Sequence, residues 1–187
     1  MGVFDMDDEA YAKVYASKSK YFKFSDFVDS EKANELGIDN RPDFYRAMNI
    51  GVLMDFLDKM REAWGGAIIV NSGYRCEELN NAVGGKPTSG HLSGYAADLR
   101  MPTGGVSIDV FYDWRMRWLT SKKIKYDECF LEKGKRSVWV HFALYSIREE
   151  QRYSNKSITS HKAQKKPCIE AKHIKYGIIP LIGLKCL

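Results

Sequence analysis

The sequence predicts an α+β fold in which a small antiparallel sheet packs against helices. Residues 43–64 place apolar side chains at steps of three and four, which is the period of an amphipathic helix. Residues 126–132 and 138–145 are two apolar-rich runs separated by a short basic turn, which is typical of an antiparallel hairpin. Residues 67–70 are short, β-branched and bounded by glycines, which favours a buried strand.

The helices expected before that first strand are indicated mainly by their ends. A short helix is expected at residues 8–18. A Ser-Asp pair at its start and Gly37 after it predict a helix over 26–36. The Asn-Arg-Pro run at 40–42 indicates a turn into the long helix, which the glycine pair after residue 64 should end.

The segments after the first strand are less regular. Residues 71–94 are rich in Gly, Asn and Ser, with one or two helical turns expected around 76–83. A second strand is expected at 96–101 and a helix at 107–120. We find no internal repeat, so a single compact unit is the simplest interpretation.

Charge divides the chain into a domain and a tail. Residues 148–187 hold nine Lys or Arg and three Glu, a net charge of +6, whereas the whole chain carries +5. We therefore expect an N-terminal extension (1–21), one folded domain (22–147) and a basic, poorly ordered C-terminal tail (148–187). The tail could contact an anionic polymer, but a solvated extension is the simpler interpretation, and nucleic acid is not an expected partner.

Composition also excludes several classes of protein. No run of 18 apolar residues is present, so no membrane span is expected. The N-terminus lacks the charged-then-apolar pattern of a secretory signal. The four cysteines are widely spaced and form no metal or disulfide pattern, which favours a reducing compartment.

The first candidate functional pair is His91 and Asp98. The two residues are seven positions apart, so they can bind one metal ion only if the chain turns between them, which Gly94 permits. An aspartate inside the apolar run that follows needs a partner, because Asp is unfavourable in strands. The alternatives are a turn histidine and a capping or salt-bridged aspartate.

A third candidate, His141, lies in an apolar strand. Its hairpin partner carries Asp127, Glu128 and Glu132, which indicates a polar site beside the strand. Two His and one carboxylate are a ligand set for catalytic zinc, and a nearby acid can serve as the base. The alternative is a histidine satisfied within the core.

These residues form a pattern that resembles a known family. The pattern is Ser89-x-His91-x-x-Gly94-x-Ala96-x-Asp98, preceded by Ser72-Gly73-Tyr74-Arg75 and followed by Trp139-Val140-His141. It resembles the zinc D-alanyl-D-alanine carboxypeptidases, a family that includes phage cell-wall endopeptidases and shares its metal site with the hedgehog signalling domain. The resemblance covers roughly residues 22–144, and residues 24–27 and 37–40 resemble the small phage and bacterial branch.

The resemblance implies an activity and its setting. It implies a zinc metallopeptidase that hydrolyses D-amino-acid-containing bonds of peptidoglycan, as a carboxypeptidase or an endolysin-type endopeptidase. The partners would be peptidoglycan stem peptides, and we expect a monomer. The protein would be cytoplasmic until release and would act on the bacterial cell wall; a phage origin is left open.

The resemblance also implies roles for individual residues. His91, Asp98 and His141 match the family's zinc ligands. Arg75 matches the arginine that binds substrate and stabilises the developing oxyanion, which suits a guanidinium. Ser89 matches a serine beside the ligand histidine, as a substrate-binding residue. The alternatives are a surface salt bridge for Arg75 and a turn cap for Ser89.

The general base is the point at which the sequence departs from the family. Many relatives place a Glu three residues before the second histidine, where this chain has Val138. The closer branch carries its acid on the preceding strand, so we expect Glu132 to be the base, with Glu128 as the alternative. The departure at Val138 also leaves open a zinc-binding module without catalysis, and a cell-wall-binding protein is a further alternative.

The choice between the two glutamates depends on hairpin register. A turn centred between residues 134 and 135 would pair Glu132 with Ser137 and Glu128 with His141, with all four side chains on one face. Asp127 would then point to the other face and anchor the strand.

Overall fold

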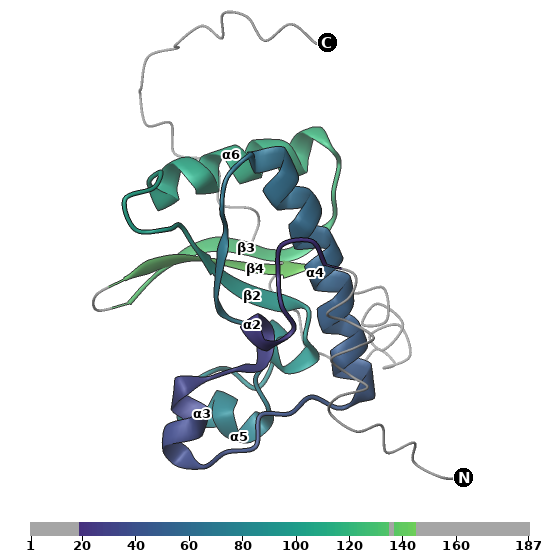
Figure 1. Ribbon diagram of the computed structural model, residues 1–187, viewed down its shortest axis with the longest axis vertical. Helices are drawn as coiled ribbons and strands as arrows, with labels where there is room; N and C mark the ends of the chain where they lie inside the picture. Colours follow the sequence, from purple (N-terminus) through teal and green to yellow (C-terminus); the bar gives the residue numbers. More distant parts are fainter. Residues whose placement is uncertain (1–18, 135–136, 145–187) are drawn as a thin grey trace, which may run out of the picture.

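The computed structural model describes residues 19–134 and 137–144, which form helices and one sheet (Figure 1). The helices are α2 (Ser25–Val28), α3 (Glu31–Leu36), α4 (Phe44–Trp64), α5 (Glu77–Ala82), the 3₁₀ helix η1 (Gly90–Ser93) and α6 (Ile108–Ser121). The strands are β1 (Ile69–Ser72), β2 (Ala96–Arg100), β3 (Tyr126–Lys133) and β4 (Val138–Leu144). The predicted α+β class is confirmed.

The strands form one antiparallel sheet in the order β1-β2-β4-β3. In Figure 1 the sheet lies between α6 on one side and the group of α3 and α5 on the other, with α4 running alongside. The predicted small antiparallel sheet with packed helices is therefore present, and the predicted hairpin of β3 and β4 is confirmed.

The two faces of the sheet differ in chemistry because side chains alternate along each strand. On one face Leu99 and Phe142 are fully buried in the main apolar core, together with residues of α4 and α6. Burying a side chain of this size stabilises the fold by roughly 1.5–3 kcal/mol. The opposite face carries Asp98 and His141, which are directly paired across β2 and β4.

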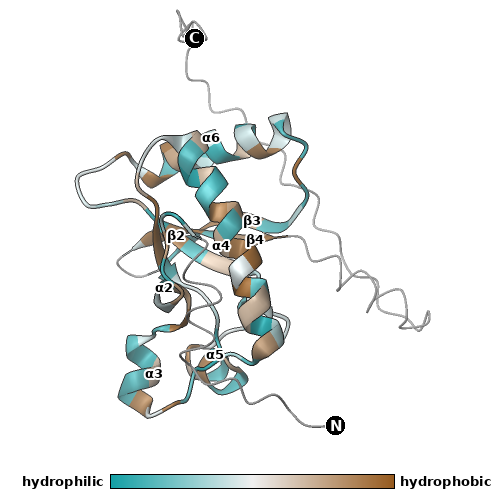
Figure 2. Ribbon diagram, turned by 45° about the vertical axis from the view of Figure 1, so that its right-hand side comes forward, coloured by the Kyte–Doolittle hydropathy of each residue, from teal (hydrophilic) through white to brown (hydrophobic). Residues whose placement is uncertain are grey.

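Helix α4 begins and ends where the sequence predicts. The Asp43 side chain accepts a hydrogen bond from the backbone N–H of Arg46, and Gly65 ends the helix in the left-handed conformation. Its buried side chains recur on one side, and Figure 2 shows hydrophobic and hydrophilic residues alternating around it. The buried residues are Ala47, Ile50, Leu53, Met54, Leu57 and Met60.

The helix predicted over 26–36 is wrong in one respect, because two short helices occupy the segment. Helix α2 ends at Val28, and α3 begins at Glu31. Between them, Ser30 has an extended backbone, and its hydroxyl accepts a hydrogen bond from the N–H of Ala33. Ser30 therefore acts as the N-terminal cap of α3, so a second helix begins after the break.

The predicted hairpin register is also wrong, by two residues. Phe130 is the residue paired with His141, and Glu132 pairs with Trp139. The same register places Glu128 opposite Ala143, and the pairing becomes irregular only between Glu128 and Tyr126. A slip of two residues preserves the face of every side chain, so both glutamates still lie on the His141 face.

Several predictions fall outside the described residues, namely the helix at 8–18 and the tail at 148–187. Within the described part, no helix is long and apolar enough to span a membrane. Cys76 and Cys129 form no disulfide there.

Candidate metal centre

His91, Asp98 and His141 converge on one point beside the sheet. Each side chain offers one ligand atom, and these atoms all lie within 4.8 Å of one another. The three residues are 2%, 3% and 5% exposed, respectively. Three ionisable groups buried together need partners or a metal ion, since isolated buried charge is strongly unfavourable.

The chain brings His91 to Asp98 by the turn that the sequence predicts. His91 lies on η1 and Asp98 on β2, with Gly94 between them at a φ of 78°. A Cβ atom at Gly94 would also lie 2.8 Å from the Arg46 carbonyl oxygen. Glycine is therefore required here both for the backbone conformation and for the close packing of α4.

The orientation of His91 leaves a defined nitrogen for a ligand. Its Nδ1 lies 2.5 Å from the Gly73 carbonyl oxygen. A carbonyl only accepts, so Nδ1 carries the proton and donates it. In the neutral ring Nε2 is then the free acceptor, and it lies 3.3 Å from Asp98 Oδ1.

His141 is held between two carboxylates. Its Nδ1 lies 2.9 Å from Asp98 Oδ1, and its Nε2 lies 2.9 Å from Glu128 Oε2. Burial lowers the pKa of His141, but the hydrogen bonds with Asp98 and Glu128 outweigh it and raise the pKa to about 9. The hydrogen bond with His141 in turn lowers the pKa of Glu128.

The two oxygens of Asp98 have separate partners. Oδ1 faces both histidines, whereas Oδ2 accepts a hydrogen bond from Arg75 Nη2 at 2.8 Å. Burial raises the pKa of Asp98, yet the hydrogen bond from His141 and the close contact with His91 outweigh it and hold the pKa well below its usual range. The carboxylate is therefore ionised and oriented before any metal binds.

Arg75 lies beside the candidate ligands and is largely buried, so it does not form a surface salt bridge. Its side chain is 17% exposed, and its Nε donates to Ser72 Oγ at 3.1 Å. Ser72 in turn pairs with Asp98 across β1 and β2. Arg75 is therefore fixed at both ends against the same carboxylate.

Ser89 and Glu132 make contacts away from the ligand atoms. Ser89 Oγ accepts a hydrogen bond from the backbone N–H of His91 at 3.3 Å, which is the turn-cap arrangement. Glu132 Oε2 accepts a hydrogen bond from Trp139 Nε1 at 2.7 Å. Beside them, the half-exposed Phe130 ring stacks on His141 with a centroid separation of 4.9 Å.

The donor set fits a catalytic zinc ion. Two histidine nitrogens and one carboxylate oxygen face each other, which is the three-ligand pattern that leaves a position open. The other atoms of all three groups are occupied by Gly73, Glu128 and Arg75. Such outer contacts fix the tautomer and orientation of metal ligands in proteins.

One of these contacts was not predicted from the sequence. The Gly73 carbonyl contact was missed because a backbone acceptor has no residue signature. The lack of a side chain at Gly73 could have been a clue, since a Cβ there would lie 2.5 Å from the Phe27 carbonyl oxygen. Glu128 was expected on the His141 face as the alternative base, and it reaches His141 Nε2 from a position opposite Ala143, two residues from the predicted register.

Comparison with known proteins agrees with this geometry. The family model described as Peptidase M15 matches residues 20–117, just over half of the chain. The matched region includes Arg75, His91 and Asp98 and ends before β3, so it does not reach His141. No curated protein matches the chain.

Proposed function

The chain belongs to the peptidase M15 family, and on that premise we propose that it is a zinc metallopeptidase of peptidoglycan stem peptides. Its substrate bond would adjoin a D-amino acid, as the motif resemblance implies. The observation that supports the proposal is the convergence of His91, Asp98 and His141, whose ligand atoms lie within 4.8 Å of one another.

The proposed ligand atoms follow from the hydrogen bonds. His91 would use Nε2, because Nδ1 donates to Gly73. Asp98 would use Oδ1, and His141 would use Nδ1, the nitrogen that faces Asp98. A zinc ion held there would polarise the scissile carbonyl and make water more acidic.

Arg75 would bind the oxygen of the substrate on which charge develops. Its hydrogen bonds to Asp98 and Ser72 fix the guanidinium, and the group has further N–H donors. A donor held in place before reaction stabilises developing charge without reorganisation. Arg75 would thus both orient Asp98 and stabilise the oxyanion.

The two glutamates would have different roles. Glu128 contacts His141 through Nε2, the ring nitrogen that faces away from Asp98, so we assign it the role of positioning His141. Glu132 lies on the same face and is held by the Trp139 indole through one oxygen. Its other oxygen would take the proton of the attacking water and pass it to the leaving amine.

The test is digestion of purified murein with the full chain, followed by mass spectrometry of the fragments. We expect new peptide termini next to a D-amino acid, lost on chelation and restored by zinc. Loss of single D-Ala residues would identify a carboxypeptidase, and cleavage of dimeric peptides an endopeptidase. His91→Ala is the matched inactive control, with bound zinc measured separately.

The remaining outcomes contradict the proposal in distinguishable ways. Bound zinc without any cleavage would indicate the non-catalytic zinc module that Val138 leaves open. Binding to sacculi that survives both chelation and His91→Ala would indicate a cell-wall-binding protein. Cleavage that persists in the chelated protein would exclude a metallopeptidase.

A further inference from the structure

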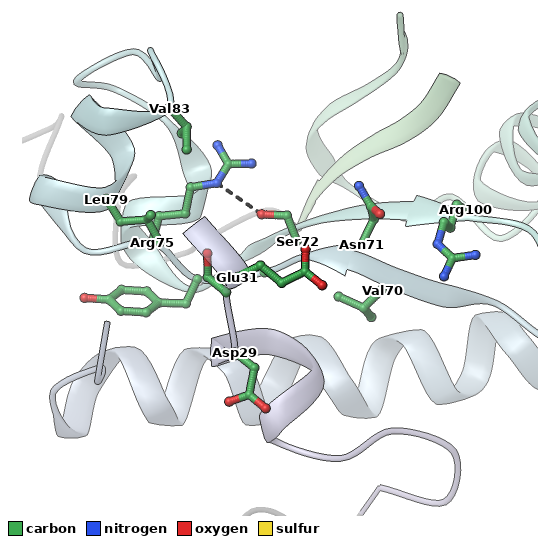
Figure 3. A pocket seen from close by; sticks show the side chains of 12 residues that line it. Asp29, Glu31, Val70, Asn71, Ser72, Arg75, Leu79, Val83 and Arg100 are labelled. Carbon is green, nitrogen blue, oxygen red and sulfur yellow. Dashed lines mark hydrogen bonds between the residues drawn. The ribbon is translucent and has the colours of Figure 1, made fainter. Parts of the chain in front are cut away.

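A second site adjoins the metal centre, as a pocket of about 430 Å³ between β1, α5 and the α2–α3 connection (Figure 3). Three of its lining residues also serve the metal centre. Arg75 donates to Asp98, Ser72 pairs with Asp98 across the sheet, and the Gly73 carbonyl accepts from His91. The pocket therefore borders the metal centre on its Arg75 side.

The pocket presents one acidic and one basic side chain that are available to a ligand. Glu31 and Arg100 both line it and are exposed, and neither forms a hydrogen bond or ion pair within the described part of the chain. In Figure 3 Glu31 lies between Arg75 and Arg100, which stand at opposite ends. Asp29 points away from the other labelled side chains, so Glu31 is the acid that faces the pocket.

Apolar side chains also line the pocket. Val70 lines the wall near Glu31, and Leu79 and Val83 of the α5 region line the opposite side. A ligand that matches these side chains carries an ammonium group, a carboxylate group and a short aliphatic stem. The aliphatic stem would cover Val70, the ammonium would meet Glu31, and the carboxylate would meet Arg100.

We infer that this pocket is a subsite for a diamino-dicarboxylic residue of the stem peptide, such as diaminopimelate. The inference rests on the proposed function, because it assumes that the metal centre cleaves such peptides. The inference adds the substrate class. Stem peptides with a zwitterionic third side chain would be the preferred substrates, peptides with lysine there would be cleaved less well, and peptides with an uncharged side chain there would be the poorest.

The experiment compares three synthetic stem peptides that differ only in the third residue: meso-diaminopimelate, lysine or norleucine. For the zinc-loaded full chain we expect kcat/KM to fall about tenfold at each step, since one charged hydrogen bond is lost each time. Glu31→Gln should remove the difference between lysine and norleucine. Arg100→Gln should remove the difference between diaminopimelate and lysine.

Matched controls are Glu35→Gln, on the same helix as Glu31, and Arg117→Gln, an exposed arginine on α6; both should keep the full preference. Equal kcat/KM for all three peptides, or a preference that survives Glu31→Gln and Arg100→Gln, would overturn the subsite. If the wild type cleaves none of the peptides, the proposed function fails. Calorimetric titration with the same peptides then decides the subsite: a binding preference lost in the two variants supports it, and equal binding overturns it.

Discussion

The protein buries charge on both faces of its sheet, and the two faces stabilise that charge differently. One face carries Asp98 and His141 and is called the metal face here. On it, the ionised Asp98 has a partner on each oxygen, and His141 has a partner on each nitrogen. On the core face, Arg115 of α6 is fully buried, and no guanidinium nitrogen has a hydrogen-bond partner in the described structure. Its neighbours there are the rings of Phe111, Tyr112 and Phe142, at 5.3–5.9 Å.

The difference shows what distinguishes a functional site from a buried charge. An aromatic ring attracts a cation that lies over its face, but it does not fix the direction in which the cation's N–H groups point. The metal face directs three donor atoms at one point and occupies the others. Convergence of oriented groups, and not burial alone, therefore carries the functional assignment.

The largest expected effect comes from Asp98→Asn, which removes charge from the metal face while keeping side-chain shape. Zinc affinity should fall by more than about 100-fold. Replacing a residue that merely contacts a metal ligand already lowers metal affinity by about 10–100-fold, and Asp98 would be a ligand itself. The metal-free protein should also lose about 3 kcal/mol of unfolding free energy, because Arg75 loses its carboxylate. Calorimetry and urea unfolding measure the two effects.

The control is Asp55→Asn, at an exposed position in the middle of α4, and it should change neither quantity by more than the error. If Asp98→Asn binds zinc as tightly as the wild type, the metal does not sit at this cluster, and the comparison between the two faces loses its functional meaning.

The next effect separates the two glutamates. Glu132→Gln should lower kcat by about 10²–10⁴-fold with zinc affinity unchanged, because a neutral amide cannot accept the proton. Glu128→Gln should lower zinc affinity by about 10–100-fold, since its contact orients His141. The reverse ranking of kcat losses would make Glu128 the base.

The sequence predicted the His91–Asp98 half of the site better than the His141 half. The first half is local: Gly94 sets the turn, and both ligands lie within eight residues of one another. The second half depends on pairing between β3 and β4, and the sequence leaves this register open because a slip of two residues keeps every side chain on its face. The role of Glu132 stays a prediction.

The same distinction applies to the fold. Helix α4 was predicted to within one residue because Asp43 and Gly65 supply both of its caps. The break between α2 and α3 was missed because Ser30 can lie inside a helix or cap one, and only its contact with the Ala33 N–H decides. The pocket beside the metal centre joins Glu31 and Arg100 from distant segments, so no motif could indicate it.

Zinc affinity should depend on pH through His141. Its pKa of about 9 means that the ring is protonated at pH 7 in the metal-free protein, and a metal must displace the Nδ1 proton. Zinc affinity should therefore rise by about tenfold per pH unit between about pH 7 and 9 and level off above.

Because the pKa of His141 is raised by folding, the same protonation stabilises the metal-free fold fully below about pH 6.5, and this stabilisation is lost as pH rises through 9. Calorimetry in buffers of different ionisation enthalpy measures the proton release, and its absence would show that His141 is not a ligand.

The smallest effect concerns Arg115 on the core face. Burial lowers its pKa to about 10, so the charged form is disfavoured by the fold at neutral pH. Arg115→Met keeps an unbranched apolar stem and removes the unpaired charge, while each cation–π interaction that the substitution removes is weak. We expect unfolding free energy at pH 7 to rise by about 1 kcal/mol, with zinc affinity unchanged. A base whose pKa is lowered by folding destabilises the fold below that pKa and does so less above it. The difference in unfolding free energy between variant and wild type should therefore narrow above about pH 10. Urea unfolding at pH 7 and pH 10.5 measures both. A loss of stability at pH 7 would mean that the aromatic rings stabilise this charge as effectively as hydrogen bonds stabilise the other face. In that case the two faces would differ in geometry but not in energy.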